Sequence, residues 1–286
     1  MPKHIVDAHT HFWGDKKGQV TSYNKEWWNR ERYGGVELKT YGDGGLQDLE
    51  RSLDRAGVEK AVVLPVAGKD RVRAVNEWYR EAVGSNPRFV LFGSIHPERD
   101  YREVLRRLGD EGIKGVKIHS LYQRFDPTNR EAMKMYEELA RLGFVALFDT
   151  FNPPDSEALT PFEIGPECVT TPRKLLDIRQ TGLQVIAAHY GGLLAYERVM
   201  EVLAGQDIYF DLSFAYDTLG EEAQRKTLNL ITKHGADRII WGSDAPWKDP
   251  KEEAEKILAL QNRLAPTEIE NIFWGNINRL LGLSLV

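Results

Sequence analysis

The sequence predicts a (β/α)8 barrel of the TIM type, built as a single domain from residues 1–286, and two observations predict it. Short apolar runs rich in valine, isoleucine, leucine and phenylalanine alternate with longer amphipathic segments along the chain. Within each run almost every residue is apolar, as is typical of parallel strands that are buried on both faces. Eight such runs are each followed by a helical pattern, and regular alternation over this length favours a closed barrel. The alternative is an open doubly wound sheet, but no glycine-rich phosphate-binding turn follows the first strand.

The predicted strands mostly end at a histidine or an aspartate. The first strand lies in the stretch Ile5–His11 and ends in a His-x-His sequence. The others are, in chain order, Val58–Val66, Phe89–His96, Ile113–His119, Phe144–Asp149, Leu183–His189, Ile208–Ser213 and Arg238–Asp244.

Helical periodicity identifies the segments between the strands. Leucine and alanine recur on one face of Leu46–Ala56, and Gly57 is placed to end that helix. The further predicted helices are Arg71–Gly84, Tyr101–Leu108, Asn129–Leu142, Pro172–Thr181, Leu193–Leu203, Glu221–His234, Lys251–Leu264 and an additional C-terminal helix, Thr267–Leu281.

Two long loops interrupt the alternation. The first follows the first strand, roughly Phe12–Gly45, and is rich in tryptophan and tyrosine, whereas the second, Thr150–Thr171, is rich in proline and glutamate. Loops of this length are often lids or binding loops. The first one fits equally well as a surface loop held in place by its own aromatic side chains.

Composition excludes several classes of partner. The net charge is −5, so electrostatics favour neither a nucleic acid nor an anionic membrane surface. The single cysteine, Cys168, excludes an internal disulfide and fits a reducing compartment. No apolar run reaches transmembrane length, and the first strand begins too early to leave room for a signal peptide. We therefore expect a cytoplasmic protein with a small-molecule substrate and no membrane or nucleic-acid partner.

The histidines gather at the ends of predicted strands. His9 and His11 lie two apart on a strand, which places both side chains on one face, with Cα atoms roughly 6.5–7 Å apart. Alone, this spacing is a weak signal for a metal site. Five of the seven histidines stand at predicted strand ends, however, namely His9, His11, His96, His119 and His189. Active sites of (β/α)8 barrels lie at the carboxyl ends of the strands, so this distribution favours a catalytic metal site there.

Two aspartates join the histidines at the strand ends. Imidazoles with a carboxylate are the usual ligands of a catalytic divalent metal that keeps a position open for water. Asp244 follows the last strand at a turn and is the candidate for metal ligand and general base, although it could instead cap the next helix. We expect one divalent metal ion, zinc by ligand type, or manganese if Asp149 also binds it.

Four motifs together resemble the amidohydrolase superfamily, in particular its amidohydrolase-2 branch. They are Asp-x-His-x-His at 7–11, Gly-x-Lys-x-His at 115–119, His-x-Gly-Gly at 189–192 and Gly-Ser-Asp-x-Pro at 242–246. The branch includes hydrolases and decarboxylases similar to 2-amino-3-carboxymuconate-6-semialdehyde decarboxylase. The resemblance implies a distorted (β/α)8 barrel with a metal held by His9, His11 and Asp244, and it makes a homo-oligomer a reasonable expectation.

One position departs from the family pattern. Members commonly carry a metal-binding histidine at the end of the fifth strand, where this chain has Asp149. We predict that Asp149 takes its place as an oxygen ligand, with water or an altered chemistry as the alternatives. In the two-metal branch a carboxylated lysine bridges the metals, and Lys117 could be placed for this. The missing histidine favours one metal and a structural Lys117.

The remaining candidates surround this centre. The family pattern gives His189 a role in proton transfer or substrate polarisation. His119 could be a metal ligand or, equally well, line the substrate pocket with Tyr122. Arg124 could clamp a substrate carboxylate or lie in solvent. Trp13 and Trp247 could enclose an aromatic or apolar substrate. His96 is expected to be structural.

Three functions follow. The first is a metal-dependent hydrolase of a small ester, lactone or amide, with Asp244 as general base toward a metal-activated water. The alternative is a metal-dependent non-oxidative decarboxylase of a small carboxylated molecule, with aromatic acids among the candidate substrates. The third is a barrel that binds a ligand without catalysis.

Overall fold

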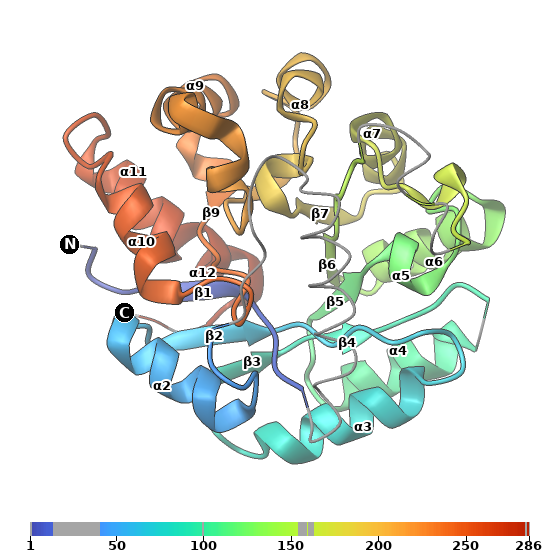
Figure 1. Cartoon of the computed structure of the whole chain (residues 1–286). Helices are drawn as coiled ribbons and strands as arrows, with labels where there is room; N and C mark the ends of the chain where they lie inside the picture. Colours follow the sequence, from blue (N-terminus) through green and yellow to red (C-terminus); the bar gives the residue numbers. More distant parts are fainter. Residues whose placement is uncertain are drawn as a thin grey trace. The chain divides into compact units, whose positions relative to one another are not determined.

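The computed structural model describes residues 2–13, 41–98, 100–153, 159, 163–283 and 285 (Figure 1). The chain divides into two compact units. Unit 1 contains residues 1–63, 86–90 and 211–286, and unit 2 contains residues 64–85 and 91–210. Most of the predicted aromatic loop, residues 14–40, lies outside the described residues, as do residues 154–158 and 160–162 of the second predicted loop.

Unit 1 is organised around β1 (Val6–Thr10), whose five residues are all buried. On one side β1 runs parallel to β2 (Lys60–Val63), with Val6 opposite Lys60. On the other side it is hydrogen-bonded to the segment that follows β9 (Ile239–Ile240), since Ala8 N–H donates to the carbonyl of Trp241 at 3.2 Å. The strand is therefore held by parallel neighbours on both edges.

The helices of unit 1 come from both ends of the chain. They are α2 (Leu46–Ala56), α9 (Ala223–His234), α10 (Pro250–Leu258), α11 (Pro266–Glu270) and α12 (Asn276–Leu281), with 3-10 turns at Ala215–Glu222 and Ala236–Arg238 and a π-helical turn at Asn271–Gly275. Gly57 ends α2 with φ +67°, in the left-handed region that favours glycine. Asp249 caps α10 by accepting from the backbone N–H groups of Lys251 and Glu252.

Unit 2 contains consecutive parallel strands separated by helices. Its strands are β4 (Gly93–Ser94), β5 (Gly115–Ile118), β6 (Val145–Phe148), β7 (Gln184–Ala187) and most of β8 (Tyr209–Asp211), paired in chain order. Its helices are α3 (Val72–Val83), α4 (Tyr101–Asp110), α5 (Ser120–Gln123), α6 (Arg130–Arg141), α7 (Pro172–Arg179) and α8 (Tyr196–Val202), with 3-10 turns at Pro166–Cys168 and His189–Gly191. Figure 1 shows this strand–helix alternation along the green and yellow part of the chain.

The predicted elements are found with local differences. The predicted strand Phe89–His96 divides into β3 (Phe89–Leu91) and β4, and Phe92 lies between them. The aromatic ring of Phe92 packs where a side chain of Gly115 would be, so glycine is required opposite it on β5. The last predicted helix is interrupted by the π-helical turn. Among the described helices, none combines the length and apolar character needed to span a membrane.

A side chain completes the hydrogen bonding of the short strand β4. Asn76 on α3 donates to the carbonyl of Ser94 at 2.9 Å and accepts from its N–H at 2.7 Å. The Ser94 hydroxyl accepts in turn from the N–H of Ala67 at 2.9 Å. Side-chain hydrogen bonds thus satisfy backbone groups of β4 that a longer strand would pair with a neighbouring strand.

We therefore expect Asn76→Ala to lower the free energy of unfolding by about 1–3 kcal/mol, because it leaves a buried N–H and a carbonyl of Ser94 without partners. Urea denaturation measures this. Arg73→Ala, at an exposed position of the same helix, is the control and should leave stability nearly unchanged. An equal effect of both substitutions would contradict the explanation.

Candidate active site

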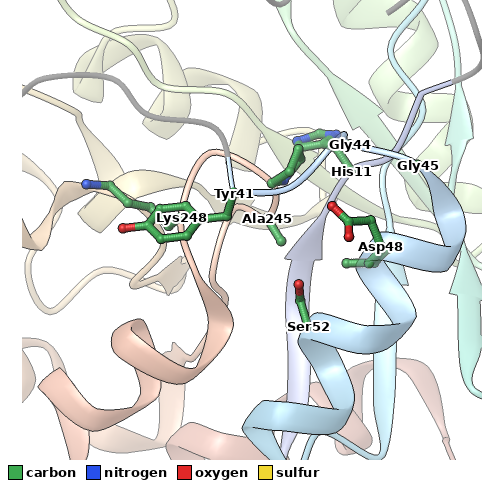
Figure 2. Close-up of a pocket in the computed structure, with 10 residues that line it drawn as sticks. His11, Tyr41, Gly44, Gly45, Asp48, Ser52, Ala245 and Lys248 are labelled. Atoms are coloured by element: carbon green, nitrogen blue, oxygen red, sulfur yellow. The ribbon is translucent and has the colours of Figure 1, made fainter.

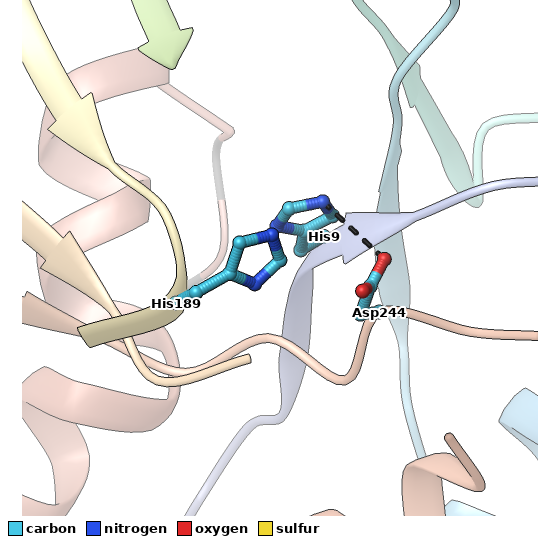
Figure 3. Close-up of side chains that lie close together, drawn as sticks. All are labelled: His9, His189 and Asp244. Atoms are coloured by element: carbon cyan, nitrogen blue, oxygen red, sulfur yellow. Dashed lines mark ion pairs between the residues drawn. The ribbon is translucent and has the colours of Figure 1, made fainter. Parts of the chain in front are cut away.

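Three side chains of unit 1 converge at the end of β1. Nε2 of His9 lies 3.2 Å from Nε2 of His11. The Asp244 carboxylate lies 3.5 Å from the first of these nitrogens and 3.4 Å from the second. Figure 3 shows the ion pair of His9 with Asp244 as a dashed line. The structure thus brings these three predicted residues together, and their role as metal ligands stays a prediction.

Backbone contacts bring Asp244 to this place. Its N–H donates to the carbonyl of His9 at 2.8 Å, and the N–H of His11 donates to the carbonyl of Ala245 at 2.7 Å. Asp244 has φ +67°, in the left-handed region, so the chain turns sharply as its side chain leaves the strand. A Cβ on Gly242 would lie 2.8 Å from that of His9, so only glycine permits this close approach.

A second carboxylate ties the same two segments together. Asp7 is fully buried and accepts from the N–H of Ser243 at 2.9 Å and from its hydroxyl at 2.6 Å. Burial raises the pKa of Asp7 to about 7, although the bonds from Ser243 oppose that rise. Asp7 faces Ser243 and the backbone, so we interpret it as a structural member of the Asp-x-His-x-His motif.

The three donor atoms are spaced as ligands of one cation would be. Atoms bonded to a tetrahedral cation at roughly 2.0–2.2 Å lie about 3.3–3.6 Å from one another. The separations of 3.4 and 3.5 Å fall in this range and that of 3.2 Å lies just below it, and two nitrogens and a carboxylate oxygen are suitable donors. His9, His11 and Asp244 therefore fit a divalent metal.

Unit 2 contains a second group of titratable side chains. Asp149, directly after β6, lies 3.2 Å from Nε2 of His189 and 3.6 Å from Nε2 of His119. Burial by itself would raise the pKa of Asp149, but the two imidazoles and the ammonium group of buried Lys117 hold it well below its ordinary value. Asp149 is thus an ionised partner of two histidines, and its role as a metal ligand stays a prediction.

The remaining predicted residues have more varied surroundings. Tyr122 is 50% exposed, and its ring centre lies 6.1 Å from that of His119. Arg124 is exposed at the end of α5. The rings of Trp13 and Trp247 pack edge to face, with centres 5.2 Å apart.

His96 is structural, as expected. Its Nε2 bonds to the carbonyl of Gln123 at 3.0 Å, and its Nδ1 accepts from the N–H of Glu98 at 3.2 Å. Both ring nitrogens are therefore used within unit 2, and the ring is buried.

One side of His11 faces a small pocket of unit 1 (Figure 2). Tyr41, Asp48 and Lys248 are among its lining residues. The ammonium group of Lys248 binds Asp217 at 2.7 Å. Because that charge is already paired, Lys248 is a weak candidate for binding a substrate anion here.

Sequence reasoning missed Asp211 and Ser213. Oδ2 of Asp211 lies 2.8 Å from Nδ1 of His9, and the Ser213 hydroxyl lies 3.1 Å from the same nitrogen. Both residues stand at the end of the predicted strand Ile208–Ser213, a position of the kind that identified the histidines. Their position at a strand end could therefore have marked them as candidates, but nothing in the local sequence links Asp211 and Ser213 to His9.

The chain matches known proteins over nearly its whole length. A family model described as Amidohydrolase matches residues 6–283. A gamma-resorcylate decarboxylase of Polaromonas sp. strain JS666 is 23% identical over 282 residues, which covers 84% of each chain.

Solved structures are similar over the full chain. A dihydroxybenzoic acid decarboxylase from Polaromonas sp. JS666, described with bound manganese and 2-nitroresorcinol, is 18% identical, with a TM-score of 0.69 over 100% of this chain and 98% of that one. A putative 2-pyrone-4,6-dicarboxylic acid hydrolase from Pseudomonas putida is 17% identical, with a TM-score of 0.68 over 100% of both. A TIM-barrel protein from Bordetella bronchiseptica is 20% identical, with a TM-score of 0.67 over 98% of this chain and 99% of that one. The predicted (β/α)8 barrel is thereby confirmed.

The close contact at Gly242 leads to a prediction. Gly242→Ala should destabilise the protein by about 1–3 kcal/mol and displace His9, because the added methyl group overlaps its Cβ. Thermal unfolding and metal titration measure the two effects. Gly109→Ala is the matched control, since no atom lies within 4 Å of the Cβ it would add. Unchanged stability and metal affinity in Gly242→Ala would show that the segments separate easily.

Proposed function

Because the chain belongs to the amidohydrolase family, whose model matches residues 6–283, we propose that it is a metal-dependent non-oxidative decarboxylase of a small aromatic carboxylic acid. The observation that carries the proposal is the similarity over 84% of each chain to a gamma-resorcylate decarboxylase. The similar solved structures include decarboxylases of dihydroxybenzoates, which adds support. The spacing of the donors in unit 1 is suited to the metal that such a reaction would use.

His9, His11 and Asp244 are proposed as the residues that hold the metal. When bound, a divalent cation would act as a Lewis acid that orients an acidic substrate and stabilises its negative charge. The ligand type suits zinc, whereas the solved decarboxylase from Polaromonas is described with manganese, so both ions are candidates.

The proton balance of decarboxylation defines what the protein must supply. The bond between the ring carbon and the carboxylate breaks, carbon dioxide leaves, and the electron pair stays on the ring carbon. A proton from the protein then forms the new C–H bond. We assign this proton to His189, because the ionised carboxylate of Asp149 at 3.2 Å stabilises the positively charged imidazole that can donate it.

Substrate binding is assigned to the remaining predicted residues. Trp13 and Trp247 would offer aromatic surface to an aromatic acid. His119 and Tyr122 would line the pocket, and Arg124 would supply a positive charge for a carboxylate.

Hydrolysis is the second candidate. The similarity to a putative 2-pyrone-4,6-dicarboxylic acid hydrolase favours it, and the same donors would then serve an enzyme that attacks an ester, lactone or amide. In that reaction Asp244 would take a proton from the attacking water. A cytoplasmic location and a homo-oligomeric state stay part of the proposal.

Metal content and product analysis test the proposal. We expect about one divalent metal per chain, loss of activity with a chelator, and carbon dioxide release from 2,6-dihydroxybenzoate or a related hydroxybenzoate. His11→Ala should lose the metal. His4→Ala, which alters a histidine paired with Glu59 elsewhere in unit 1, should retain it. Turnover of lactones or esters without carbon dioxide release would contradict the proposed decarboxylase activity and assign hydrolysis to the protein.

Asp149→Asn separates two roles of that residue. If Asp149 acts through His189, the variant keeps its metal and loses about 10²–10⁴-fold in kcat, because the neutral amide no longer stabilises the charged imidazole. Metal analysis and steady-state kinetics measure this. Asp126→Asn, which alters a carboxylate paired with Lys174 in unit 2, is the control. If Asp149→Asn loses the metal and Asp126→Asn retains it, Asp149 is instead assigned as a metal ligand.

A further inference from the structure

We propose that Asp211, assisted by Ser213, is a positioning residue that fixes the tautomer of His9 and thereby keeps Nε2 of this histidine unprotonated, as binding a metal ion requires. The inference rests on the metal site of the proposed function and adds residues that the family motifs do not contain. All of the side chains involved belong to unit 1.

The two oxygens of Asp211 contact different partners. Its Oδ1 accepts from the hydroxyl of Ser213 at 2.5 Å and from the backbone N–H of Ser213 at 3.0 Å. Its Oδ2 lies 2.8 Å from Nδ1 of His9. Asp211 is completely buried and His9 is 1% exposed, so water does not compete for these bonds.

This geometry determines which ring nitrogen carries the proton. With Oδ2 of Asp211 as the acceptor of this 2.8 Å bond, Nδ1 of His9 is the donor. In a neutral imidazole Nε2 then carries the lone pair. On that side of the ring lie Nε2 of His11 at 3.2 Å and the carboxylate of Asp244 at 3.5 Å. The opposite tautomer would place a proton among the three donors and block a metal there.

The backbone fixes the position of Asp211 as firmly as that of His9. The N–H of Leu212, between Asp211 and Ser213, donates to the carbonyl of Ile240 at 2.9 Å. The next residue along, Trp241, accepts from the N–H of Ala8. Residues 240 and 241 thus set the position of both partner segments, although Asp211 and His9 are 202 residues apart in sequence.

Ser213 holds the orientation of the Asp211 carboxylate and does not take over its contact with His9. Residues two apart in extended chain share a face, so Asp211 and Ser213 both point toward His9. The two bonds from Ser213 to Oδ1 hold the carboxylate plane, which aims Oδ2 at the imidazole. We therefore expect removal of the hydroxyl to have a smaller effect than removal of the carboxylate.

The test uses the full-length protein and two readouts. Nitrogen-15 NMR of the metal-free wild-type protein should show His9 as the Nδ1–H tautomer. Zinc and manganese affinities are measured by competition with a chromophoric chelator. In Asp211→Asn, whose amide can donate to Nδ1, the tautomer population should move toward Nε2–H and metal affinity should fall about 10–100-fold.

Two further variants complete the design. Ser213→Ala should give a smaller loss of metal affinity and keep the Nδ1–H tautomer. Asp237→Asn makes the same chemical change at an exposed carboxylate paired with Arg238 and should leave both readouts unchanged.

Three results would overturn the inference. They are a wild-type His9 with its proton on Nε2, an Asp211→Asn protein with unaltered tautomer and metal affinity, or an equal loss in Asp237→Asn. If the wild-type protein binds no metal, the proposed function fails. The tautomer of His9 in the metal-free wild-type protein still tests the role of Asp211 in that case. It also does so if Asp211→Asn does not fold.

Discussion

The parallel pairing of β1 with the segment after β9 is the interaction on which the candidate site depends. It joins residues more than two hundred positions apart in the chain, through bonds such as that from Asp244 N–H to the carbonyl of His9. Side chains alternate along extended chain, so a shift of one residue in this pairing would turn the site residues to the opposite face. Gly242 permits the close approach, and the left-handed conformation of Asp244 turns its carboxylate toward the histidines.

Buried carboxylates around this pairing each have a defined partner. Asp7 accepts from Ser243, whereas Asp211 accepts from Ser213 and lies 2.8 Å from Nδ1 of His9. A buried carboxyl group without partners would cost several kcal/mol if it were charged, so these bonds favour the folded state. The contact of Asp211 with His9 belongs to the same set of interactions.

Membership of the amidohydrolase family establishes the class of enzyme more firmly than the reaction. Hydrolysis and decarboxylation would use the same histidines and aspartate, and the similar solved structures include enzymes described with either activity. The two reactions differ in what protonates the product, which directs attention to His189 and its partner Asp149. Asp149 follows β6 directly, and the surrounding imidazoles and Lys117 hold its pKa well below the ordinary value.

The sequence by itself determined the alternation of strands and helices, the family, and the residues gathered at strand ends. It could do so because hydrophobic periodicity is local and because barrels place their sites at the carboxyl ends of strands. His9, His11 and Asp244 were selected in this way as candidate metal ligands, whereas His96, also at a strand end, was expected to be structural. The tertiary structure alone decided which atoms meet. The bond from His9 to Asp211 spans 202 residues, and the contact of Asp149 with His189 depends on the register of neighbouring strands. Such pairings follow from backbone geometry across the sheet, which no local pattern of residues encodes.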